Sequence, residues 1–411
     1  MVIFGAGADL NRMLKNCNII NYIECIVDSD MKKAGSVVNG IPVRSIDFLE
    51  QMRFGETVYI SSKKYYDEIC QTIQSKAQYL KMVYLGDVLV DKQEEHERKI
   101  WYRCADTERN LYLKYKEDYT IKNETFIKRY FRLMKNLDEH SAKTVNVILD
   151  RLQLLYSTTN KQLDIFTESE QLQLTECKKI LDKEIFRVGD DIYAYGNSYL
   201  PKKFFNLGIW FYKYGLDFVE NKAFVRQGDI IDCGAYIGDS TLLFSHYTDK
   251  RVYALEAQKE NCNLIERTIS LNEAENIRIL NVAVADEKRK GYIYHHDNAN
   301  WGTMNPYSVR DYSGKEEISV DTIDHIVEEN QIHCSLIKAD IEVSEGAMLR
   351  GAVQTLKKYR PVLLICLHHT AEDFWGIKPF IEDLNLGYQF KIFKKTDGNI
   401  LTGTYLIAEC R

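Results

Sequence analysis

The chain has 411 residues, of which 45% are hydrophobic and 28% charged, and this predicts a globular protein of two or three domains with a large core. A net charge of -6 opposes a nucleic-acid or anionic-membrane binder, because phosphate contacts need a basic surface. The 10 cysteines are scattered without a C-x-x-C pair, which is typical of a reduced, cytoplasmic setting. The longest apolar run, Val362–Leu367, is too short to span a bilayer, so we expect neither export nor a membrane span.

Residues 1–88 are predicted to form a small Rossmann-like α/β domain. Strand and helix patterns alternate there, which favours a parallel, doubly wound sheet. The expected elements are a strand at Val2–Phe4, a turn at Gly5-Ala-Gly7, a helix at Asp9–Lys15, strands at Tyr22–Val27 and Thr57–Ser61, and a helix through Ile69 and Ile73.

The first glycine turn is typical of a nucleotide-binding unit, with Asp28 as a candidate ribose partner. The dinucleotide fingerprint is incomplete, because Leu10 stands where its third glycine would be. The stretch Asp28–Val43 resembles the small domains that precede sugar-modifying enzymes and bind nucleotide-sugars. We therefore expect this domain to bind a nucleotide or nucleotide-sugar without hydride chemistry.

Residues 89–190 predict a helical connector, because apolar residues recur at helical spacing among dense charges. A hairpin is expected at Ile185–Tyr195, followed by an aromatic-rich helix at Phe204–Val219. Residues 191–411 then predict a third domain.

The most informative motif is Asp232-Cys-Gly234-Ala-Tyr236-Ile-Gly238, which predicts the end of a strand, a glycine turn and the start of a helix. A second acid, Glu256, closes the next strand candidate. S-adenosylmethionine carries an α-ammonium, which a strand-end carboxylate can hold, and a ribose diol, from which a second carboxylate can accept. The spacing predicts a methyl-donor site to which Tyr236 also belongs, in which Asp232, Gly234 and Gly238 border the methionine portion and Glu256 accepts from the ribose.

Further strands are predicted downstream, and together they suggest a doubly wound sheet of seven strands with a late hairpin. They are Ile277–Ala283, Ser335–Ala339, Pro361–Leu367, Tyr388–Phe393 and Thr404–Ala408.

A third motif, Lys338-Ala-Asp340-Ile-Glu342-Val-Ser-Glu345, continues into Leu349-x-Gly351-Ala352. With the two motifs above, it makes residues 205–408 resemble the FkbM family of S-adenosylmethionine-dependent methyltransferases. The resemblance implies the seven-stranded methyltransferase sheet and a saccharide or related glycan precursor as acceptor.

The family usually has Asn where Tyr236 stands and Gly where Val343 stands. Because Asn and Gly tolerate positive φ, the backbone of these two loops can differ from the family's.

Asp340, Glu342 and His369 are the candidate catalytic residues. Asp340 and Glu342 alternate at a strand end and can face one side, either to orient the acceptor hydroxyl or to act as base. The alternative is a purely structural role, as an acidic pair at a helix N-terminus. His369 is a candidate general base through neutral imidazole, or else a surface histidine. Because successive strand residues face opposite sides, His368 and His369 should not chelate one ion, and we expect no metal site.

Two further features have open interpretations. Asp286 lies where the adenine of the donor would be bordered, but it is equally well explained as a turn residue. The loop Asn298–Asn305, which contains Trp301, could stack on a sugar or be an ordinary loop.

The sequence therefore predicts an O-methyltransferase with S-adenosylmethionine as cofactor and a glycan or nucleotide-sugar-type acceptor. It is compatible with an oligomer. Two alternatives are a nicotinamide-dependent nucleotide-sugar oxidoreductase, which would use the first domain, and a catalytically silent nucleotide-binding protein.

Overall fold

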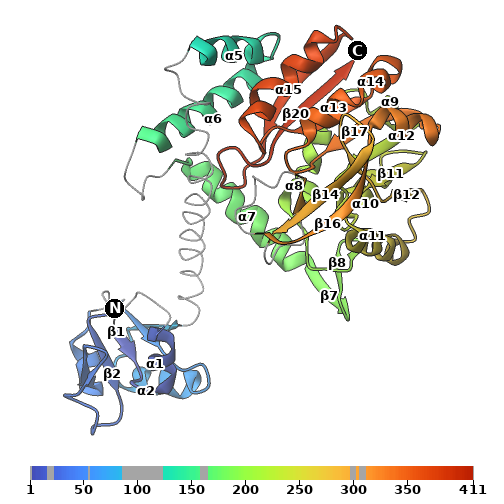
Figure 1. Ribbon diagram of the computed structural model, residues 1–411. Coiled ribbons are helices and arrows are strands. Elements are labelled where there is room, and N and C mark those ends of the chain that lie inside the picture. Colours follow the sequence, from blue (N-terminus) through green and yellow to red (C-terminus); the bar gives the residue numbers. More distant parts are fainter. Residues whose placement is uncertain are drawn as a thin grey trace. The chain divides into compact units, whose positions relative to one another are not determined.

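The computed structural model describes residues 2–15, 23–53, 56–85, 124–157, 165–296, 302–304 and 312–410. The chain divides into two compact units, residues 1–104 and 105–411, each of which mixes helices with a mainly parallel sheet (Figure 1). The α/β class predicted from the sequence is confirmed.

The first unit contains a six-stranded sheet in the order β3-β4-β2-β1-β5-β6. All neighbouring pairs are parallel except β3 and β4. The elements are β1 (Val2–Phe4), α1 (Ala8–Lys15), β2 (Cys25–Asp28), β3 (Val37–Val38), β4 (Ile41–Ser45), η2 (Ile46–Gln51), β5 (Thr57–Ile60), α2 (Tyr66–Lys76) and β6 (Lys81–Tyr84).

Both faces of this sheet are buried, because alternate residues of each strand enter separate cores. Phe4 of β1 packs in a cluster with Leu49 and Ile73, whereas Ile3 packs in another with Leu10 of α1. The predicted strands and helices of this unit are present. The short β3–β4 hairpin was not predicted, although its Asn39-Gly40 turn, with φ of 50° and 84°, is a strong hairpin signal.

The second unit is built on a seven-stranded sheet in the order β12-β11-β10-β17-β18-β20-β19. Its sheet strands are β10 (Asp229–Cys233), β11 (Val252–Leu255), β12 (Ile277–Leu280), β17 (Cys334–Ala339), β18 (Val362–Cys366), β19 (Tyr388–Lys394) and β20 (Thr404–Cys410). The first five are parallel, and β20 runs antiparallel to both of its neighbours. The predicted sheet and its late hairpin are confirmed.

Helices cover both faces of this sheet (Figure 1). The core on one face includes residues of α6, α12, α13, α14 and α15, and the core on the other includes residues of α8, η3, α9, α10 and α11. The helices are α5 (Glu124–Met134), α6 (Glu139–Ser157), α7 (Glu168–Glu184), α8 (Leu207–Trp210), η3 (Lys213–Phe218), α9 (Lys222–Gln227), α10 (Asp239–Ser245), α11 (Lys259–Asn272), α12 (Ile323–Glu329), α13 (Glu345–Arg350), α14 (Val353–Tyr359) and α15 (Ala371–Asp383).

Two helices from the predicted connector, α5 and α6, pack on the second unit. Arg129 of α5 forms an ion pair of 2.8 Å with Glu372 of α15. Ser141 of α6 accepts a hydrogen bond of 2.9 Å from the Ile392 backbone N–H of β19. We therefore describe these helices as part of the second unit.

Two small sheets complete the second unit. A three-stranded sheet consists of β7 (Ile185–Gly189), β8 (Ile192–Tyr195) and β9 (Ser198–Leu200), so the predicted hairpin is confirmed. A four-stranded sheet in the order β13-β16-β14-β15, not predicted from the sequence, consists of β13 (Ala283–Val284), β14 (Arg289–His296), β15 (Gly302–Thr303) and β16 (Tyr312–Asp321).

Two predicted elements are wrong. The single helix at Phe204–Val219 is broken into α8 and η3, and η3 is itself kinked at Tyr214 and Gly215, which have φ of 52° and 81°. The strand at Ile277–Ala283 ends at Leu280, and Ala283 pairs in the four-stranded sheet instead.

Among the described residues, no helix has both the length and the apolar character needed to cross a membrane.

Gly351 and Gly376 provide a matched test of the packing that supports the sheet. A Cβ on Gly351 would lie 2.1 Å from the Ala285 carbonyl oxygen, whereas one on Gly376 of α15 would meet nothing within 4 Å. We expect Gly351→Ala to destabilise the protein by about 1–3 kcal/mol, as overpacking does. Gly376→Ala should be neutral or stabilising by about 0.5–1 kcal/mol. Denaturant unfolding measures both, and equal stabilities would contradict the packing described.

Candidate functional site

A cavity of about 260 Å³ lies at the carboxyl ends of β10, β11 and β17, where ligands bind in open α/β sheets. Strand-end loops, the segment around α8 and the four-stranded sheet all contribute to its wall. The lining residues are Phe204, Asn206, Ile209, Tyr214, Gly234, Tyr236, Asp239, Ser240, Leu255, Glu256, Ala257, Gln258, Asn261, Val282, Ala283, Val284, Ile293, Met304, Asp340, Ile341 and Glu342.

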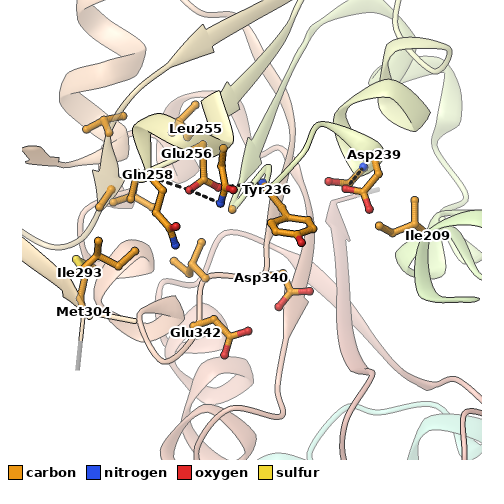
Figure 2. Close-up of a pocket in the computed structure, with 18 of the residues that line it drawn as sticks. Ile209, Tyr236, Asp239, Leu255, Glu256, Gln258, Ile293, Met304, Asp340 and Glu342 are labelled. Carbon is orange, nitrogen blue, oxygen red and sulfur yellow. Dashed lines mark hydrogen bonds between the residues drawn. The ribbon is translucent and has the colours of Figure 1, made fainter. Parts of the chain in front are cut away.

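Five of the predicted site residues line this cavity: Gly234, Tyr236, Glu256, Asp340 and Glu342. Figure 2 shows Glu256 and Asp239 on opposite sides of Tyr236, with Asp340 and Glu342 below them in the view. Acidic groups therefore surround an otherwise largely apolar space.

The glycine turn after β10 brings two chain segments into contact. Gly234 has φ of 77°, and a Cβ there would lie 2.1 Å from the Asp340 carbonyl oxygen. The absence of a side chain therefore permits the turn to touch the end of β17, in addition to bordering the cavity. Gly238 does not line the cavity, contrary to expectation; it has φ of 85° and packs against Ile265 of α11.

Tyr236 and Val343 adopt left-handed backbone despite their side chains, with φ of 51° and 85°. The Tyr236 N–H donates a hydrogen bond of 2.9 Å to Glu256 Oε2, and its ring packs edge-on against Phe204. Both loops therefore have positive φ at these positions although neither residue is Asn or Gly.

Asp232 lies behind the cavity wall and does not line it. The residue is fully buried, and Lys338 Nζ lies 2.9 Å from its Oδ1. The hydroxyls of Ser240 and Thr241 donate to its Oδ2 at 2.7 and 2.6 Å. The predicted direct contact of Asp232 with a donor ammonium is not supported by this geometry, because its partners hold the carboxylate against the turn.

Sequence reasoning missed Asp239, a second acid close to the glycine turn. It is the first residue of α10, lines the cavity and is 2% exposed. Oδ1 accepts from the Ser240 N–H at 3.0 Å, and Oδ2 is buried with no hydrogen-bond partner among the described residues. Burial raises the pKa of this carboxyl to about 7. The only sequence signal was an acid directly after Gly238, which is also an ordinary way to start a helix.

Glu256 follows β11 and is 7% exposed. Its two oxygens accept hydrogen bonds of 2.9 Å from the backbone N–H groups of Tyr236 and Gln258. Burial raises the pKa of the carboxyl, although these hydrogen bonds oppose the rise. Oε1 also accepts from the Asn261 side-chain amide at 3.5 Å, whereas Oε2 can accept a further hydrogen bond from a diol in the cavity.

Asp286 lies outside the cavity wall, so its predicted place beside an adenine is not supported. Its Oδ2 accepts from Arg350 at 2.9 Å, and this partner lowers the pKa of the carboxyl. The predicted acceptor loop falls mostly outside the described residues, Trp301 included. Met304, at its described end, does line the cavity.

His369 lies among three carboxylates just outside the cavity. Its Nδ1 is 2.8 Å from Glu345 Oε1, and its Nε2 is 3.4 Å from Asp340 and 3.5 Å from Glu342. Although burial opposes protonation, Glu345 and Glu342 raise the pKa of His369 well above its ordinary value. The raised pKa favours a protonated imidazole in the ligand-free protein, which counts against the predicted neutral imidazole base.

Asp340 and Glu342 both line the cavity but differ in protonation behaviour. Burial opposes ionisation of Asp340, but His369 and Lys338 hold its pKa well below the usual range. Burial raises the pKa of Glu342. Of the two, Glu342 is the stronger proton acceptor.

The geometric argument against a shared ion is also wrong. β18 ends at Cys366, so strand alternation does not extend to His368 and His369, whose ring centroids are 4.3 Å apart. Asp340, His368 and His369 each offer a ligand atom, and all these atoms lie within 4.8 Å of one another.

Comparison with known proteins gives two family matches. Residues 232–391 match the model of the methyltransferase FkbM domain, and residues 1–81 match a model described as C2185-like, N-terminal. No curated protein matches the chain significantly.

Several solved structures are similar to the chain. The methyltransferase FkbM from Methylobacillus flagellatus KT is 18% identical with a TM-score of 0.44, and the match covers 99% of this chain and 89% of that one. A putative O-methyltransferase from Klebsiella pneumoniae is 11% identical with a TM-score of 0.31, covering 66% and 99%. A putative methyltransferase from Streptococcus mutans, solved in complex with SAH, is 11% identical with a TM-score of 0.28, covering 46% and 93%.

The ion pair of Lys338 and Asp232 gives a test of how the site is held. We expect Lys338→Met to destabilise the protein by about 3–5 kcal/mol, because it leaves Asp232 buried without its cation. Adding Asp232→Asn should recover part of this loss. Lys357→Met, on the exposed side of α14, is the matched control and should change little. Chemical denaturation measures all three variants; a Lys338→Met protein as stable as the control would contradict the assignment.

Proposed function

We propose that this chain transfers a methyl group from S-adenosylmethionine to a hydroxyl of a saccharide or glycan precursor, because residues 232–391 match the methyltransferase FkbM domain. The observation that supports the donor most directly is the unpaired, buried Oδ2 of Asp239 at the cavity wall. An unpaired carboxylate oxygen is costly to bury, and a ligand cation would relieve that cost.

The polar groups of the cavity wall fit those of S-adenosylmethionine. Asp239 would hold the α-ammonium, and Glu256 would accept from the ribose hydroxyls. Asp232 would act indirectly, by holding the turn that presents Asp239. The apolar side chains of Leu255, Val282 and Ile293 are suited to the flat face of adenine.

Acceptor chemistry is assigned to the end of β17. When bound, S-adenosylmethionine supplies a methyl group whose bond to sulfur breaks, with its electron pair returning to the sulfonium, as the bond to the acceptor oxygen forms. Glu342 would take the proton of the acceptor hydroxyl, because burial makes it the more basic carboxylate. Asp340, kept ionised, would orient that hydroxyl; Tyr214 Oη donates to Asp340 at 3.3 Å and restrains it.

The nature of the acceptor is supported by the family resemblance. The first unit is proposed to bind a nucleotide-linked sugar. Its Asp28 accepts hydrogen bonds from the backbone N–H groups of Ala6 and Asp30 and pairs with Lys33, so this carboxylate supports the glycine turn. Leu10, where the third glycine of the dinucleotide fingerprint would stand, is fully buried in the core, which argues against the nicotinamide-dependent alternative.

Asp239→Asn and Glu256→Gln should each weaken donor binding by about 1–3 kcal/mol, because each removes a partner of a polar group on the donor. The affinity of the wild type should rise with pH through about 7, as Asp239 ionises to receive the ammonium, and Asp239→Asn should abolish this rise. Isothermal titration with S-adenosylmethionine measures both effects. Asp286→Asn is the control and should bind as the wild type does. If all three variants behave alike, the donor site lies elsewhere.

Glu342→Gln should bind the donor normally but transfer methyl groups about 10²–10⁴-fold more slowly, because it cannot accept the proton. In the wild type, the rate should fall as pH drops through the raised pKa of Glu342, and the variant should lose this acidic limb. Formation of S-adenosylhomocysteine with a panel of glycan acceptors measures the rate. Equal rates, or an unchanged pH profile in the variant, would remove Glu342 as the base.

A further inference from the structure

The structure brings one carboxylate and two imidazoles together at the acceptor side of the cavity, and we propose that Asp340, His368 and His369 bind one first-row divalent cation of the Zn²⁺ or Mn²⁺ type. Neither the family match nor the donor site accounts for this convergence. Asp340 belongs both to this cluster and to the wall of the cavity.

Sheet topology explains why the three residues meet. β17 and β18 are parallel neighbours, with Ala339 opposite Ile365, so the residues that follow them emerge at the same edge. The candidate ligand atoms lie within 4.8 Å of one another. Ligand atoms around an ion with bonds of about 2.1 Å can be roughly 4 Å apart, so small side-chain rotations would close the site.

His368 has a nitrogen that the protein leaves without a partner. Nδ1 is buried and has no hydrogen-bond partner among the described residues. A buried polar atom of this kind normally finds a partner, and a metal ion is one that a neutral imidazole can take.

His369 has a carboxylate on its other ring nitrogen, as metal-binding histidines usually have. Glu345, which is fully buried, pairs with its Nδ1 at 2.8 Å and is itself fixed by the Ile341 N–H at 2.8 Å. This leaves Nε2 directed toward Asp340. A carboxylate on the far nitrogen orients the ring and strengthens it as a ligand, so Glu345 is a positioning residue.

Charge around the cluster also favours a cation. Asp340, Glu342 and Glu345 surround His369, and Oδ1 of Asp340 and Oε2 of Glu342 lie 3.4 and 3.5 Å from the same Nε2. A divalent ion bound here would offset this negative charge.

Imidazole and carboxylate ligands together favour first-row transition ions and zinc over Mg²⁺ and Ca²⁺, which prefer oxygen. An ion here would lie beside the acceptor hydroxyl and lower its pKa as a Lewis acid. This role rests on the proposed function, but binding of the ion does not.

The test is titration of the chelator-treated full-length protein with Co²⁺, followed by visible absorbance, and with Zn²⁺, followed by calorimetry. We expect one equivalent to bind, with the d–d bands of an ordered nitrogen and oxygen site. His368→Ala and Asp340→Asn should each lose at least about tenfold in affinity, and Glu345→Gln about 10–100-fold. His333→Ala, an exposed histidine packed on Tyr359, is the control and should bind as the wild type does.

Absence of the bands, or equal binding by the three ligand-set variants and the control, would overturn the proposal. Circular dichroism checks each fold; if His368→Ala is unfolded, Asp340→Asn and Glu345→Gln decide the matter. Titration of S-adenosylmethionine into the same metal-free protein separates the two proposals. Site-dependent cobalt binding without donor binding would sustain the cation site and remove the proposed function, and the reverse result would do the opposite.

Discussion

The buried ion pair between Asp232 and Lys338 is the interaction on which the site depends. Lys338 Nζ lies 2.9 Å from Asp232 Oδ1 and donates hydrogen bonds to the carbonyl oxygens of Cys233 and Gly234 at 3.2 and 2.9 Å. One ammonium thus ties the end of β10 and its glycine turn to β17. Because both residues are almost wholly buried, their mutual attraction and their hydrogen bonds must offset the loss of hydration. The turn that presents Asp239 and the strand end that carries Asp340 are consequently fixed relative to each other.

The same pairing explains why two acids that look alike in the sequence have different chemistry. Asp232 has a cation and two hydroxyl donors, whereas Asp239, seven residues later, has one backbone donor and an unpaired oxygen. A carboxylate that the protein satisfies internally supports structure. One that is left unsatisfied at a cavity is available to a ligand.

Much of the sheet could be predicted from the sequence because its strands are short apolar runs bounded by turn residues. The positions of Glu256, Asp340 and Glu342 were predictable because these residues follow such strands, and side chains at the carboxyl ends of parallel strands meet at one edge. The four-stranded sheet was missed because its strands, such as Arg289–His296, carry charges on their exposed positions and lack a continuous apolar run. Which of Asp232 and Asp239 lines the cavity could not be predicted, because it depends on which acid pairs with Lys338.

Tertiary contacts impose left-handed backbone on the loop after β17, although the residues concerned are not glycine. Glu342 and Val343 are consecutive residues with φ of 50° and 85°, a conformation that costs roughly 1–3 kcal/mol for each non-glycine residue. Two contacts hold this loop: the Ile341 N–H donates to Glu345 at 2.8 Å, and Thr303 Oγ1 donates to the Glu342 carbonyl at 3.0 Å. The strained backbone persists because these contacts fix the loop from both sides. The loop conformation places Glu342 at the cavity wall. Glu345 therefore has two effects at once, since the carboxylate that fixes the strained loop also orients His369.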